Sequence, residues 1–153
     1  MQNQYQNLFE GAFDTFKVFD NLTVAEAANV PANAPKSIWQ ILNHLVVWQR
    51  YHIACIKNIE QCFELDEYES WIETQVDNQQ ALDGLVATFY RQQQQVIDAI
   101  ATFGAKEPYL QKKLKYVQEL SVHLSFHVGE VVLMRRMYGN YPLPHQMKEF
   151  LGL

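Results

Sequence analysis

The stretch Leu120-Ser-Val-His-Leu-Ser-Phe-His-Val-Gly-Glu-Val-Val132 combines a helical pattern of apolar residues with two histidines four residues apart. In an α-helix, residues at this spacing lie one above the other on the same face. The imidazoles of His123 and His127 can therefore converge on one metal ion. A third histidine, His44, lies in another helical stretch, and an open metal site of the catalytic type requires three protein ligands. The apolar residues expected to share the buried side of the His123 helix are Leu120, Leu124, Val131 and Met134.

The composition indicates one globular domain over residues 1–153, because 48% of the residues are hydrophobic and a chain of this length can bury a sizeable core. The formal net charge is -5 and the sequence pI is about 5.5, so no basic surface is expected for a nucleic acid. The start of the chain lacks the pattern of a secretory signal, and no apolar run reaches membrane-spanning length. We therefore expect a soluble, cytoplasmic protein without a membrane or nucleic-acid partner.

Four segments carry helical periodicity, and none shows the alternation of a β-strand. This pattern predicts an all-α helical bundle, although periodicity alone leaves the topology open. Arg135 and Arg136, near the end of the last segment, suit the negative pole of a helix. The predicted helices run from about Gln4 to Phe19, from Ser37 through a stripe that ends near Ile59, from Thr74 to Phe103, and from Lys115 to Tyr138.

Two connections separate these helices. Ser37 followed by Gln40 is a capping-box signal and marks the start of the second helix. Before it, prolines and asparagines interrupt residues 22–36, where only Val24 to Asn29 is expected to form a short turn. A second long, acidic connection runs from about Gln61 to Glu73.

Three inward-facing histidines without partners would each leave an unsatisfied ring nitrogen, which costs about 1–3 kcal/mol per group. A shared metal ion would satisfy all three. The alternative is that each histidine bonds a carbonyl, a water molecule or a carboxylate. His52, eight residues after His44, is rotated by about 80° and is predicted to pack near the site without binding metal. His145 is predicted to be a tail residue.

The sequence around the three histidines resembles that of a known family. Ser37-Ile-Trp-Gln-Ile-Leu-Asn-His-Leu45, followed by His123-Leu-Ser-Phe-His-Val-Gly-Glu-Val-Val-Leu-Met-Arg-Arg-Met-Tyr-Gly139, resembles the DinB/YfiT-like metalloenzyme family (DinB superfamily). The similarity extends over nearly the whole chain. It implies a four-helix bundle with up-down-down-up topology and a divalent metal held by His44, His123 and His127. The family includes S-transferases and isomerases that use low-molecular-weight thiols, together with members of unknown activity.

The favoured function is a metal-dependent transferase in which a low-molecular-weight thiol attacks a small-molecule substrate. Zn and Ni are the first candidates for the metal and Fe or Mn also fit, because neutral imidazoles accept several divalent ions. The alternatives are a metal-dependent hydrolase and a non-enzymatic bundle that binds a metal or another ligand. A third alternative is a homodimeric scaffold whose interface uses exposed aromatic residues. The candidates for that interface are Phe63, Tyr68, Trp71 and Phe150.

No residue is assigned a catalytic role from the sequence. Glu130, three residues after His127, is the candidate to orient a ligand, to act as a base or to approach the metal. The alternative is a carboxylate that simply packs near the helix surface.

Cys55 and Cys62 are expected to be free thiols. If the second helix continues through both, their seven-residue separation places the Cα atoms about 10 Å apart, which is too far for a disulfide.

Overall fold

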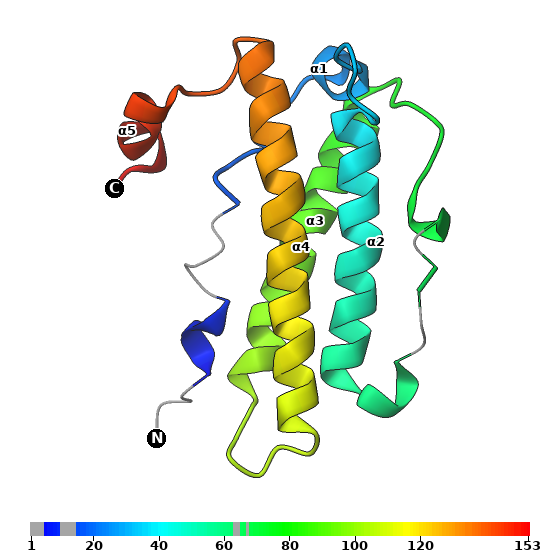
Figure 1. The fold of residues 1–153 in the computed structure, drawn as a ribbon, viewed down its shortest axis with the longest axis vertical. Helices are drawn as coiled ribbons and strands as arrows, with labels where there is room; N and C mark the ends of the chain where they lie inside the picture. The colour runs from blue at the N-terminus through cyan, green and yellow to red at the C-terminus, as the bar shows by residue number, and fades with distance from the viewer. Residues whose placement is uncertain (1–4, 10–14, 63–64, 67) are drawn as a thin grey trace.

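The computed structural model describes residues 5–9, 15–62, 65–66 and 68–153, and within these it is helical with no β-strand. Two of its α-helices have only five residues each, α1 (Val24–Ala28) and α5 (Met147–Leu151). α2 packs against both α3 and α4, and Figure 1 shows α2 and α3 running in one direction with α4 antiparallel to them. The three long helices are α2 (Ile38–Lys57), α3 (Gln79–Ala101) and α4 (Leu110–Met137).

Side-chain caps determine where the helices begin. The Ser37 side chain accepts a hydrogen bond from the Gln40 backbone N–H, and the Gln40 side chain accepts one from the Ser37 backbone N–H. The predicted capping box is therefore confirmed. The short turn expected after Leu22 is helix α1, which begins with a second capping box formed by Thr23 and Glu26.

Two predicted helix boundaries were wrong. α3 begins at Gln79 and not at Thr74, because Asn78 caps it by accepting a hydrogen bond from the Ala81 backbone N–H. α4 begins at Leu110, five residues before the predicted start. Tyr109, the residue before it, has a left-handed backbone with φ of 57°, so the right-handed helix cannot extend further toward the N-terminus.

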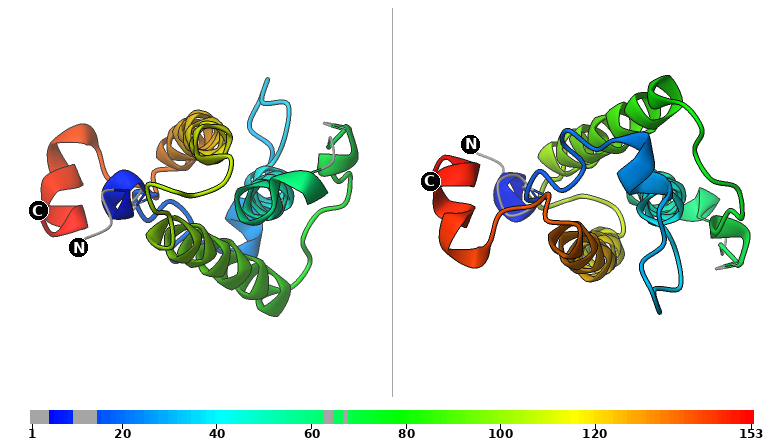
Figure 2. Two further views of the ribbon diagram at one scale, coloured as in Figure 1. Left: turned by 90° about the horizontal axis from the view of Figure 1, so that it is seen from below. Right: turned by 90° about the horizontal axis from the view of Figure 1, so that it is seen from above.

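The predicted helix from Gln4 to Phe19 is wrong for the described residues near its end. Phe16 and Lys17 have φ values of 53° and 52°, which a right-handed helix cannot contain. Gln6–Leu8 form one turn of 3-10 helix (η1), and residues 16–21 form turns. Gln4 and residues 10–14 of that prediction lie outside the described residues. Figure 2 shows η1 beside α3 and α4, on the side away from α2.

The core lies between the three long helices and is closed on one side by the N-terminal segment. The Phe19 ring packs edge-on against Phe89 of α3, with their centroids 4.9 Å apart, and neither side chain is more than 1% exposed. The apolar residues predicted to be buried in the last helix are all buried. They are Leu120, Leu124, Val131 and Met134.

Cys55 and Cys62 form a disulfide, so the expectation of free thiols was wrong. The expectation assumed one continuous helix, but α2 ends at Lys57 and the chain turns back through the 3-10 turn Ile59–Gln61. The two Cα atoms are therefore 4.6 Å apart. The bridge joins the end of α2 to the start of the connection that leads to α3.

No helix in the described parts of the chain is long and apolar enough to cross a membrane.

Candidate metal centre

The structure brings together the three histidines singled out in the sequence. His44 lies on the second turn of α2, and His123 and His127 lie on adjacent turns of α4. Their candidate ligand nitrogens all lie within 4.8 Å of one another, and His44 Nε2 is 3.0 Å from His123 Nε2. The packing of α2 against α4 therefore joins residues that are almost eighty positions apart in the chain.

The other ring nitrogen of two of these histidines has a partner. Ser70 Oγ is 2.8 Å from His44 Nδ1, and Glu130 Oε2 is 2.6 Å from His127 Nδ1. Such contacts select the tautomer and orient the ring of a metal-binding histidine. They leave Nε2 of both rings for the centre of the cluster. Ser70 Oγ also accepts a hydrogen bond from the indole N–H of Trp48.

The surroundings of the cluster favour uncharged imidazoles. Burial lowers the pKa of His44 to about 4, and the neighbouring His127 contributes in the same direction. Burial, followed by the proximity of His127 and His44, lowers the pKa of His123 to about 3. Only a neutral imidazole offers a lone pair to a metal ion, so these rings are in the ligating state at neutral pH.

The metal-free protein is expected to lose stability as the pH falls from about 6.5 toward 4. In this range the histidines of the unfolded chain bind protons, whereas the depressed pKa values keep His44 and His123 neutral in the folded state. Unfolding therefore takes up protons, and each histidine lowers the free energy of unfolding by up to about 1.4 kcal/mol per pH unit.

Urea denaturation at pH 7 and pH 5, with a chelator present, measures this loss. The variant His123→Ala should show a smaller difference between the two pH values, since one of the histidines with a lowered pKa is gone. Equal pH dependence of the variant and the unmodified protein would contradict the lowered pKa of His123.

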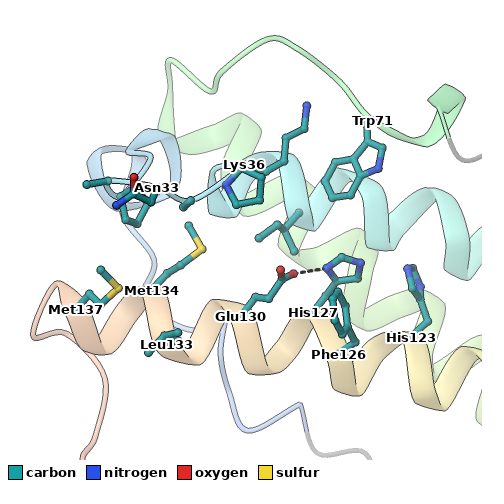
Figure 3. Close-up of a pocket in the computed structure, with 15 residues that line it drawn as sticks. Asn33, Lys36, Trp71, His123, Phe126, His127, Glu130, Leu133, Met134 and Met137 are labelled. Carbon is teal, nitrogen blue, oxygen red and sulfur yellow. Dashed lines mark hydrogen bonds and ion pairs between the residues drawn. The ribbon is translucent and has the colours of Figure 1, made fainter.

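The cluster lies at one end of a pocket of about 570 Å³ (Figure 3). His123 and His127 line this pocket from α4, and the loop before α2 forms the opposite wall. Trp71 stacks on His44 with the ring centroids 3.8 Å apart and an angle of 11° between the planes. Phe126 packs edge-on against His127, at 4.9 Å between centroids. The cluster is thus flanked by aromatic rings, and His123 and His127 open to the cavity.

The remaining residues named from the sequence lie as follows. His52 is buried outside the cluster, with Nδ1 2.8 Å from the Trp48 carbonyl oxygen, as predicted for a packed residue. His145 is exposed near the C-terminus. Glu130 is 36% exposed at its side chain, and its Oε2 lies 2.6 Å from His127 Nδ1.

Two of the four aromatic residues considered for a dimer interface have partners within the chain. Trp71 lies against His44, and Phe150 packs on Tyr141 with centroids 5.5 Å apart. Phe63 and the side chain of Tyr68 lie outside the described part of the molecule.

Sequence reasoning did not assign Ser70, Trp71 or Phe126 to the site, because neither connections nor exposed helix positions carry a periodic signal.

Three imidazoles that converge beside a cavity are a donor set that fits a divalent ion and leaves a coordination position for a further ligand. Imidazole donors suit several transition metals, so the set does not select one of them.

The comparison with family models gives a match to the DinB superfamily over residues 12–131, which is most of the chain and includes all three histidines. The chain has no significant match to a curated protein or to a solved structure.

Proposed function

The chain belongs to the DinB superfamily, and on this premise we propose that it is a metal-dependent enzyme that uses a low-molecular-weight thiol as its nucleophile. His44, His123 and His127 hold the divalent ion, for which Zn or Ni is the first candidate and Fe or Mn also fits. The reaction is a thiol transfer to an electrophilic small molecule.

One observation carries the proposal of an enzyme. The histidine cluster opens onto a pocket of about 570 Å³, which is within the size range of small-molecule sites. A purely structural metal site has all its coordination positions filled by the protein and needs no such opening. The pocket therefore favours catalysis over the alternative of a structural or non-enzymatic bundle.

A divalent ion bound here supplies a Lewis acid that lowers the pKa of a thiol and keeps it as a thiolate at neutral pH. The protein's own residues prepare the site for this. Glu130 holds the Nδ1 proton of His127 and is a positioning residue. Trp71 covers one face of His44 and excludes water from it.

Cobalt substitution tests the proposal, because Co(II) has visible absorption bands that respond to its ligands. Protein purified without an affinity tag is stripped with a chelator, loaded with Co(II) and titrated with 2-mercaptoethanol. We expect a saturable thiolate-to-cobalt band, and no such band with ethylene glycol, which lacks the sulfur. A spectrum that 2-mercaptoethanol leaves unchanged would contradict thiol binding at the metal.

The up-down-down-up topology implied by the family stays a proposal. It is consistent with α2, α3 and α4, since α2 and α3 share one direction and α4 runs in the opposite direction (Figure 1). A homodimer and a cytoplasmic location stay predictions. The Cys55–Cys62 disulfide counts against the latter, since disulfides are rare in reducing compartments.

A further inference from the structure

The pocket beside the histidines continues along α4 as an open groove. From α4 the lining residues run from His123 to Met137, and at 1.5 Å per residue this stretch is about 20 Å long. Figure 3 shows the histidines at one end and Met134 and Met137 at the other. We call this the α4 groove. Its lining residues are Pro31–Lys36, Ile41, Trp71, His123, Phe126, His127, Glu130, Leu133, Met134 and Met137.

Large apolar side chains are exposed along the α4 groove. Phe126, Leu133 and Met137 are 64%, 61% and 60% exposed. Contiguous exposed apolar residues on a protein surface mark a binding site more often than isolated ones do. These three residues therefore line the same groove as the metal-site histidines His123 and His127.

Both charged side chains that line the α4 groove, Lys36 and Glu130, are bonded to a neighbouring side chain. The ammonium group of Lys36 is 3.0 Å from Glu73 Oε1, and Figure 3 shows its side chain extending away from α4. Glu130 lies at the histidine end and is bonded to His127. Beyond Glu130, the lining residues contributed by α4 are Leu133, Met134 and Met137, none of which is charged. Charge complementarity therefore favours a neutral occupant in this part of the groove.

The wall opposite α4 is held by its own turn. The Ala34 backbone N–H donates to the Pro31 carbonyl oxygen at 3.0 Å, and Asn33 has the positive φ of 66° that the third position of a type II turn requires. Prolines at positions 31 and 35 further restrict the backbone. A wall constrained in this way loses little conformational freedom when a ligand binds.

We propose that the α4 groove between Glu130 and Met137 binds the uncharged, apolar part of the electrophilic substrate, an elongated hydrocarbon chain or ring system of about 10 Å. Its reactive carbon would lie at the histidine end. This inference rests on the proposed function and adds the substrate class to it.

A pair of fluorescent probes tests the inference. N-phenyl-1-naphthylamine is neutral, and 1-anilinonaphthalene-8-sulfonate has the same ring system with an added anionic group. The neutral probe is expected to bind the metal-free protein at least about tenfold more tightly, an effect of roughly 1.4 kcal/mol, because the lining residues of α4 beyond Glu130 carry no charge to pair with the sulfonate. Equal or tighter binding of the sulfonate would overturn the proposed neutral class.

Matched variants locate the probe. Leu133→Glu places a charge inside the α4 groove, whereas Val122→Glu places the same charge at an equally exposed position of α4 outside it. Leu133→Glu should lower the affinity for the neutral probe at least tenfold, and Val122→Glu should change this affinity less than about twofold. Met137→Glu, a second exposed groove variant, should repeat the loss. Equal effects at positions 122, 133 and 137 would overturn the inference.

Two further measurements separate the possible failures. Each protein is also loaded with zinc and its zinc content is measured, so that a protein that binds zinc but not the neutral probe refutes the groove inference while the proposed function stands. Sedimentation velocity tests whether a second copy covers the groove. A dimer that Leu133→Glu dissociates, together with no probe binding, would assign the groove to self-association and refute the inference.

Discussion

Replacing His123 by Ala is expected to lower the affinity for Zn(II) by about 100-fold or more and to reduce the metal content of the purified protein from about one ion per chain to a trace. The reason is geometric, because His44 and His127 alone supply two of the three converging nitrogens. The measurement is elemental analysis of protein purified without an affinity tag, followed by titration with Zn(II) against a competing chelator.

His52→Ala is the matched control for this variant. His52 is a buried histidine of α2, 3% exposed, and its bonded ring nitrogen contacts the Trp48 carbonyl oxygen outside the cluster. Its loss removes a buried imidazole without removing a predicted ligand, so the metal content should stay near one per chain. Glu130→Gln keeps all three ligands but weakens the contact to His127, so its metal content should lie between those of His123→Ala and His52→Ala. Equal metal content in His123→Ala and His52→Ala would refute the three-histidine site.

The histidine pair was predictable because it lies within one helix. A four-residue spacing places two side chains on one face of α4 whatever the rest of the fold does. His44 was predictable in position, since the Ser37–Gln40 capping box determines where α2 begins and therefore which way His44 points. That α2 packs beside α4 is a tertiary fact, and only the family resemblance indicated it in advance.

The features that sequence reasoning missed lie where the chain leaves regular structure. Ser70 and Trp71 come from the long connection before α3, and their contacts with His44 depend on a path that no periodicity describes. The disulfide was missed for the same reason. The end of α2 at Lys57 carries no proline or glycine signal, and the return of the chain brings Cys62 back to Cys55.

Replacing Arg135 by Ala is expected to lower the free energy of unfolding by about 3–4 kcal/mol, well beyond the effect of the same change at Arg136. The guanidinium of Arg135, 5% exposed, donates to the carbonyl oxygens of Val18 at 2.7 Å, Asp20 at 3.0 Å and Asn140 at 3.2 Å. Removing it leaves three carbonyl groups without this donor, and an unsatisfied buried acceptor costs about 1–3 kcal/mol.

Arg136→Ala is the control because sequence reasoning treats both arginines alike, as cations near a helix end. Arg136 donates to the carbonyl oxygen of Pro142 from a half-buried position, so its loss should cost only about 1 kcal/mol. Urea denaturation of the metal-free proteins at pH 7 measures both values without a contribution from metal binding. Arg135→Lys retains the charge but not the planar fork that reaches three acceptors, so it should recover only part of the stability. If Arg135→Ala and Arg136→Ala lower the free energy of unfolding equally, the segment around Val18 and Asp20 is held to α4 by its apolar contacts and not by the Arg135 guanidinium.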